Sequence, residues 1–240
     1  MPENTEILNT VRAALMSQPP VGLATHPIAL RYDDGTLTLE GEVASVAAKK
    51  LALEAAAAVP GVTGIIDRVR VAPTQPMGDG AIRDELRRAF LQEPAFAGFA
   101  IRETAKGRTE SVSEPPRRDG MIEYEVADGI VTLNGQVPGL GQKRLAGVLA
   151  WWVPGSRDVV NGIEEAPEEE DNDAEMTDAV RLALEKDVFV DAGQIRVTTL
   201  DRVVTLEGLV PKEAEKDMAE QDAWCVFGVD RVVNRLAVRP

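Results

Sequence analysis

The sequence is poor in the residues that build reactive and metal-binding centres. It has one cysteine, Cys225, and one histidine, His26, among 240 residues. A lone cysteine excludes an internal disulfide, and the two residues together cannot supply the usual His and Cys ligand set of a zinc site. The P-loop, zinc-protease and serine-hydrolase motifs are also missing. We therefore expect a protein that is not an enzyme, with no catalytic residue, no metal site and no cofactor.

Long apolar runs and an excess of basic charge are missing as well. The longest apolar run, Leu145 to Val153, covers nine residues, about half of the roughly 20 that a membrane-spanning helix needs. Asp and Glu outnumber Lys and Arg by 40 to 26, and the net charge of −14 disfavours attraction to nucleic-acid phosphates and anionic lipids. The first residues have no basic and apolar segments of a secretory signal. These absences predict no transmembrane segment, no nucleic-acid partner and a cytoplasmic location, with a periplasmic location as the alternative if an export signal has been removed.

What the sequence does contain is one pattern that occurs three times, which is the signature of a tandem repeat. Each copy has a β-rich segment that ends in a glycine, and a second glycine follows twenty residues later. We interpret these six glycines as structural turn glycines. They are Gly41 and Gly61 in the first copy, Gly135 and Gly155 in the second, and Gly208 and Gly228 in the third.

The same order of secondary structure is predicted around the glycines of every copy. Apolar residues four apart predict an amphipathic helix first, and hairpin turn signals then separate two strands. A helix rich in small residues lies between the paired glycines, and alternating apolar residues after the second glycine predict a closing strand. Asp79 and Asp173 are expected to cap the first helices of copies two and three.

This order defines an α+β fold of three tandem αββαβ modules. Each module is expected to be a three-stranded mixed sheet packed against two helices, because a unit of roughly 70 residues can just sustain one core. The predicted domains are residues 1–73, 74–167 and 168–240.

The T-L-x-G-x-V type strand, the alanine-rich helix and the closing Gly-Val strand resemble the BON domain family over nearly the full chain. These motifs are structural and indicate the fold better than an activity. The resemblance implies binding and assembly modules and not catalysts, since relatives include phospholipid-associated envelope proteins, a potassium sensor and similar modules in secretion rings. Two residues depart from the pattern: Ser156 replaces the expected valine in copy two, and Arg202 replaces the turn glycine in copy three.

Copy two carries an insertion. Its Phe90 precedes the first glycine by 45 residues, whereas Leu15 and Leu184 precede theirs by 26 and 24. The additional residues lie near 103–120, and their composition predicts an exposed mobile loop, either a plain insertion or a partner-binding loop. Four basic residues in an acidic chain favour partner binding slightly: Lys106, Arg108, Arg117 and Arg118.

Three tryptophans are candidate interface residues. Trp151 and Trp224 occupy the same position in their copies, on the flank of the second helix. They are expected either to contact another copy, a subunit or a membrane, or to cap the module core. Trp152 is expected in the core.

An acidic run from Glu164 to Asp173 joins copies two and three, and like charges predict a solvated linker. A calcium loop is the alternative, but Met176 and Leu182 stand where such a loop starting at Asp171 needs Gly and Glu.

The function expected from these features is that of a non-enzymatic cytoplasmic interaction or self-assembly protein with a stress-related role. A protein partner or self-association is the first expectation for its binding. The alternatives are a protein associated with phospholipid or the cell envelope, and a potassium-binding sensor. If one copy carries the function, we expect it to be copy two.

Overall fold

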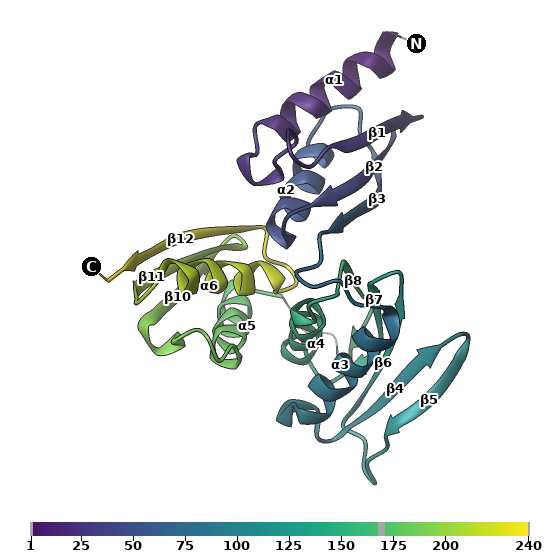
Figure 1. The fold of residues 1–240 in the computed structure, drawn as a ribbon, viewed down its shortest axis with the longest axis vertical. Helices are drawn as coiled ribbons and strands as arrows, with labels where there is room; N and C mark the ends of the chain where they lie inside the picture. Colours follow the sequence, from purple (N-terminus) through teal and green to yellow (C-terminus); the bar gives the residue numbers. More distant parts are fainter. Residues whose placement is uncertain (1, 168–170, 240) are drawn as a thin grey trace. The chain divides into compact units, whose positions relative to one another are not determined.

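The computed structural model describes the chain except for residues 1, 168–170 and 240. It divides into two compact units, residues 1–72 and 73–240. The first unit holds module 1, and the second holds modules 2 and 3 (Figure 1). Among the described residues, modules 1 and 3 form the expected helix, strand, strand, helix and strand, and module 2 contains the same order with additional strands, so the α+β fold of repeated modules is confirmed. The boundaries at 1–73, 74–167 and 168–240 stay a prediction.

Modules 1 and 3 are built alike. Their second strand is central, antiparallel to the strand before it and parallel to the strand that follows the helix. Buried Leu37 and Leu39 in module 1, like Val204 and Leu206 in module 3, alternate with more exposed residues, because only one face of each sheet is covered by helices. The elements of module 1 are α1 (Pro2–Met16), η1 (Pro19–Val21), β1 (Ile28–Asp33), β2 (Thr36–Val43), α2 (Val46–Ala57) and β3 (Gly64–Val71). Those of module 3 are α5 (Asp173–Lys186), η3 (Ala192–Gln194), β10 (Ile195–Leu200), β11 (Val203–Val210), α6 (Glu213–Cys225) and β12 (Arg231–Val238).

Module 2 has a larger sheet than predicted. The strand order is β5-β4-β6-β7-β8, with β9 also paired to β7, so the expectation of three strands is wrong for this module. The elements are α3 (Asp79–Gln92), η2 (Pro94–Phe96), β4 (Phe99–Ala105), β5 (Arg108–Ser113), β6 (Gly120–Ala127), β7 (Ile130–Val137), α4 (Leu140–Trp152), β8 (Asp158–Asn161) and β9 (Glu164–Glu165).

Strand β5 and the end of β4 come from the insertion near 103–120, which the sequence led us to expect as a mobile loop. Strand β4 pairs in parallel with β6, and β5 folds back antiparallel on β4 through a turn at Lys106 and Gly107, both with positive φ. Strand β5 lies at the sheet edge and most of its residues are exposed. An edge strand that buries neither face has no apolar alternation, and its polar sequence therefore looks like that of a loop.

The first glycine of each copy lies inside a strand and not at its end. Gly135 pairs with Ile122 at φ +130°, and Gly208 pairs with Ile195 at φ +150°. A Cβ atom would lie 2.1 Å from the carbonyl oxygen of Met121 at the first position and 2.0 Å from that of Gln194 at the second. Each strand continues for two more residues to a buried valine. These glycines therefore permit a close approach between strands, and the expectation that they end the strands is wrong.

Asp79 and Asp173 do not cap their helices as expected. Both lie in the first turn, where the carboxylate accepts hydrogen bonds from the hairpin that follows. Asp79 accepts from the backbone N–H groups of Asp128 (3.1 Å) and Gly129 (2.9 Å), and Asp173 accepts from those of Asp201 and Arg202 at 2.8 and 3.1 Å. The side chain that caps α5 is that of Asn172. The two aspartates thus attach a hairpin turn to a helix start.

Replacing Asp79 by alanine is expected to lower the free energy of unfolding by about 1 to 2 kcal/mol, because two backbone donors lose a charged acceptor. Urea denaturation of the full chain measures the change. Asp84→Ala is the matched control, since Asp84 lies exposed on the same helix and its loss should cost less than about 0.5 kcal/mol. Equal losses for the two variants would contradict the hairpin attachment.

Candidate functional site

Modules 2 and 3 are joined through helix α4, which contacts both α5 and α6 (Figure 1). We call this surface the α4 junction. It consists of Arg144 and Trp152 on α4 and of their partners Asp171, Asp222 and the backbone of Phe227. No helix among the described residues has both the length and the apolar character that crossing a bilayer requires.

Arg144 lies at one end of the α4 junction and is 1% exposed. Its Nε donates to the carbonyl oxygen of Phe227 at 3.0 Å, and its Nη2 donates to Oδ1 of Asp171 at 2.5 Å. Its Nη1 has no hydrogen-bond partner among the described residues. A guanidinium taken out of water is costly unless it is paired. The two contacts therefore tie α4 firmly to the chain entering module 3 and to the loop after α6.

Trp152 lies at the other end of the α4 junction. Its indole Nε1 donates to Oδ1 of Asp222 on α6 at 2.8 Å, and Asp222 is 5% exposed. Burial first, and then the negative charge of Asp187, raise the pKa of Asp222 to about 8, while the hydrogen bond from Trp152 opposes the rise. The junction therefore holds a buried carboxyl group whose ionisation is disfavoured.

Two contacts close the edges of the same surface. Lys186 of α5 pairs with the buried carboxylate of Glu93, which follows α3, at 2.8 Å. The ammonium of Lys143 lies 5.4 Å from the ring centroid of Phe227, within the range of a cation–π interaction. Both contacts run between modules 2 and 3 and add to those of the α4 junction.

The tryptophans take three different positions. Trp224 is 3% exposed, which leaves too little free surface for contact with a subunit or a membrane; a cap of the module core and a contact with another copy both stay predictions. Trp152 packs partly against the core of module 2 as expected, but its indole N–H reaches module 3. Trp151 is half-buried and stays a predicted interface residue. Sequence alignment of the copies did not point to Arg144 or Asp222, because the other copies have different residues at those positions.

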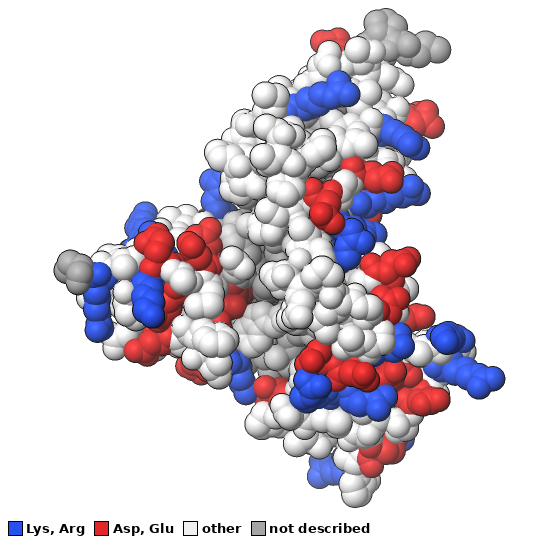
Figure 2. Space-filling model, in the orientation of Figure 1, with Lys and Arg blue, Asp and Glu red and all other residues white. Residues whose placement is uncertain are grey.

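The basic residues of the insertion form two separate pairs at opposite ends of β5. Lys106 lies in the β4–β5 turn and Arg108 begins β5, and Figure 2 shows basic side chains projecting at this hairpin tip. Arg117 and Arg118 follow β5, where Arg118 pairs with Glu114 and Arg117 lies 3.8 Å from Asp119. Of the four, Arg117 and Arg118 have acidic neighbours, so they do not add to a basic patch at the tip.

A cluster of charged side chains fixes the hairpin to α3. Glu103 of β4 accepts hydrogen bonds from Arg87 and from the hydroxyl of Tyr124, both at 2.8 Å, and Arg83 lies 3.2 Å away. Burial acts to raise the pKa of Glu103, but the hydrogen bonds from Arg87 and Tyr124 outweigh it and the pKa is lowered. Burial and then the bond to Glu103 raise the pKa of Tyr124. The insertion is thus an ordered part of module 2.

The acidic run between modules 2 and 3 is only partly a solvated linker. Glu165 pairs with Lys143 at 3.0 Å, Asp171 with Arg144, and Asp173 binds the hairpin turn. The remaining glutamates at 168–170 lie outside the described residues. Glu165 and Asp171 are bound because basic residues of α4 lie beside them, whereas Asp173 is bound by backbone N–H groups; the sequence of the run alone shows neither.

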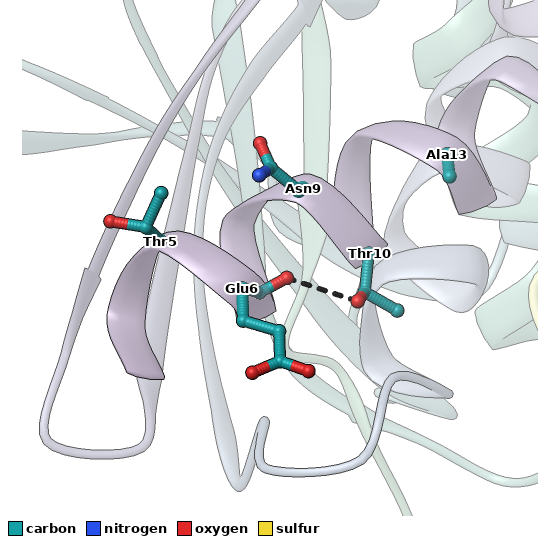
Figure 3. Close-up of a pocket in the computed structure, with 5 residues that line it drawn as sticks. All are labelled: Thr5, Glu6, Asn9, Thr10 and Ala13. Atoms are coloured by element: carbon teal, nitrogen blue, oxygen red, sulfur yellow. Dashed lines mark hydrogen bonds between the residues drawn. The ribbon is translucent and has the colours of Figure 1, made fainter. Parts of the chain in front are cut away.

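Other surface features are weaker candidates for a functional site. The hollow in Figure 3 follows the exposed side of α1, where Thr10 Oγ1 donates to the carbonyl oxygen of Glu6 at 3.0 Å. All its lining residues come from one helix, so no second element opposes a ligand there. Across the described parts of the chain, no group of three or more His, Cys, Asp or Glu side chains is placed to hold a metal ion. The residues lining the hollow are Thr5, Glu6, Asn9, Thr10 and Ala13.

Comparison with known proteins gives one family and a few relatives. The BON domain profile matches residues 4–73, 108–167 and 172–240; the second match excludes α3, which the insertion separates from the rest of module 2. Osmotically-inducible protein Y of Escherichia coli (strain K12) is 29% identical over 142 residues, which is 57% of this chain and 71% of that protein. Two structures of CdsD, a structural protein of the type III secretion system of Chlamydia trachomatis, are also similar. They are 15% and 16% identical, span 97% and 98% of this chain and 96% and 93% of theirs, and have TM-scores of 0.26 and 0.25, too low for a structural argument.

Proposed function

This chain belongs to the BON domain family, with three domains in tandem, and from that premise we propose that it is a non-enzymatic interaction or self-assembly protein. The similarity to a protein named for osmotic induction supports a stress-related role. We propose a cytoplasmic location, and a periplasmic one is the alternative.

The α4 junction is the observation that carries this proposal. Two BON modules of this chain bind one another through the outer face of a helix, with a buried arginine and a tryptophan at the contact. Arginine and tryptophan are the residue types that most often dominate protein interfaces. Recognition of one module by another is therefore within the chemistry of this chain.

Exposed apolar side chains offer surfaces for further contacts. Val188 and Phe189, in the loop after α5, are 88% and 71% exposed. Leu200 at the end of β10 is 72% exposed. Adjacent exposed apolar residues are typical of contact sites, whereas single ones are ordinary. The Val188 and Phe189 pair is thus the better candidate.

Light scattering coupled to size exclusion, at several concentrations, tests self-assembly. We expect a mass above the 25.9 kDa of one chain that rises with concentration. Phe189→Ser should lower this mass, because it removes an apolar contact, whereas the control Leu200→Ser should leave it unchanged. A monomer at every concentration would contradict self-assembly and leave binding to another protein.

The second candidate function is association with phospholipid, which the exposed Val188 and Phe189 pair also favours. Because the net charge is −14, we expect any binding to be stronger to zwitterionic than to anionic vesicles. Flotation of the full chain with both kinds of vesicle tests this. Absence from both floating fractions would remove the candidate. No described feature favours potassium binding, which stays an expectation from the family resemblance.

A further inference from the structure

Strands β1 and β5 each lie at the open edge of a sheet (Figure 1). Strand β1 ends the sheet of module 1 and β5 ends that of module 2, and in the part of the chain that the structure describes no strand pairs with the outer side of either. Each strand is six residues long. Backbone N–H and C=O groups on the outer side of an edge strand can pair with a strand of another molecule.

Module 2 shows that the edge formed by β1 can take an additional strand. Strands β1 and β6 are equivalent, because each pairs with the strand that carries the first glycine of its copy: Ile28 lies opposite Gly41, and Ile122 lies opposite Gly135. The other side of β6 is covered by β4, whereas that of β1 is open. The module fold therefore has room for a strand at this position.

The charges along β1 and β5 are complementary when the two strands run antiparallel. With all six residues of each strand paired, Arg108 lies opposite Asp33 and Glu110 lies opposite Arg31. Both charge pairs fall on one face, because residues two apart in a strand point to the same side. All four side chains are exposed, so they are available to a partner.

We propose that β5 of one chain pairs antiparallel with β1 of a second copy of this chain. The adjoining turns add to the complementarity, because Asp34 follows β1 and Lys106 precedes β5, and antiparallel pairing brings these two ends together. Each chain has both edges, so the contact is head-to-tail and repeats from chain to chain. This inference rests on the proposed self-assembly and names the surfaces that meet.

The helices of the two modules do not obstruct this pairing. Glu110 lies opposite Glu103, whose carboxylate binds Arg87 of α3, so the charges of β5 are on the face that carries α3. Arg31 of β1 is exposed between half-buried neighbours, so it is on the face of module 1 that its helices leave open. When Arg31 and Glu110 share a face, the helices of module 1 and helix α3 lie on opposite sides of the joined sheet.

Other edges match β5 less well. On β10 of module 3, which is equivalent to β1, the same alignment places the uncharged Leu200 and Thr198 opposite the charges of β5. Two β5 strands paired with each other over their full length place serines opposite Arg108 and Glu110. Charge complementarity therefore selects β1 as the partner of β5.

Exchanging the charges tests the pairing in the full chain. Arg108→Glu combined with Glu110→Arg reverses β5, and Arg31→Glu combined with Asp33→Arg reverses β1. Neither exchange alters the net charge, and light scattering coupled to size exclusion measures the mass over a range of concentrations. Each exchange alone turns two favourable pairs into two unfavourable ones, so the concentration at which the mass rises above one chain should increase by roughly tenfold.

Both exchanges in one chain make the strands complementary again and should restore the wild-type concentration dependence. The control is Glu85→Arg combined with Arg88→Glu, which exchanges an exposed ion pair within α3 and should leave the mass unchanged. Far-UV circular dichroism confirms that each variant is folded.

The possible results separate this contact from self-assembly in general. A mass that rises at the same concentration in the wild type and in both single exchanges would overturn the pairing of β1 with β5 and leave self-assembly intact. A weaker assembly that the combined exchange does not restore would overturn it as well. A monomer at every concentration would overturn both this inference and the proposed self-assembly.

Discussion

Gly135→Ala is expected to lower the free energy of unfolding by about 3 kcal/mol or more. The added Cβ would lie 2.1 Å from the carbonyl oxygen of Met121, and the φ of +130° belongs to a region that only glycine occupies easily. The backbone of β6 or β7 must shift, which also disturbs the pairing of the central strand. Losses of this size arise from few mechanisms, and backbone overlap is one of them.

The control for this prediction is Gly141→Ala in helix α4. No heavy atom lies within 4 Å of a Cβ built there, and alanine is favoured over glycine in a helix by about 1 kcal/mol. This variant should therefore be slightly more stable than the wild type. If the repeat needs this glycine because two strands approach closely, urea denaturation should show a lower free energy of unfolding for Gly135→Ala and a slightly higher one for Gly141→Ala. Equal losses in the two variants would count against that explanation.

Arg144→Ala is expected to lower the free energy of unfolding by about 1.5 to 3 kcal/mol. The carbonyl of Phe227 and the carboxylate of Asp171 both lose their donor, but the Asp171 side chain is 32% exposed and can be solvated, so no fully buried charge is left behind. The lost free energy should appear as weaker docking of module 3 on module 2. We therefore expect urea unfolding to become less cooperative and proteases to cleave more readily between the modules.

Arg88→Ala on α3 is the matched control. Its side chain is 56% exposed and pairs with Glu85 within the same helix, an arrangement that contributes less than about 1 kcal/mol. If Arg144→Ala behaves like this control, the α4 junction is not held by its buried arginine.

The repeat made the fold predictable from the sequence. The spacing of glycines and apolar residues is set by the scaffold that the copies share. The same order of helices and strands could therefore be predicted for all three copies. Strand β5 was not predicted because an edge strand with mostly exposed residues lacks the alternation on which strand prediction depends. Strand β4 lies between β5 and β6, and it lacks the alternation because three buried residues are followed by four partly exposed ones.

The α4 junction was not predicted from the sequence because its residues differ between the copies. Arg144 aligns with Lys50 in copy one and with Asp217 in copy three, so a search for what the copies share passes over it. The contacts between modules 2 and 3 use residues that differ from copy to copy, whereas a repeat pattern shows only the residues that recur.

One recurring feature was nonetheless missed. Every copy has a lysine eight residues after its first glycine, and an Asp or Asn six residues after its second. In copies two and three the Asn side chain donates to the backbone of that lysine, and in copy one Asp67 pairs with the Lys49 ammonium instead. The residues are Lys49, Lys143, Lys216, Asp67, Asn161 and Asn234.

The α4 junction also sets how this chain can engage a partner that has repeated sites. Docked modules hold their binding surfaces at one separation, so modules 2 and 3 can act together only on sites spaced to match. Binding of two linked modules to two sites at once raises the overall affinity, but only if the geometry lets both modules reach their sites. If the modules bind a partner as proposed, three similar domains do not amount to three interchangeable binding units, because two of them form a pair whose fixed spacing would favour partners with sites at the same distance.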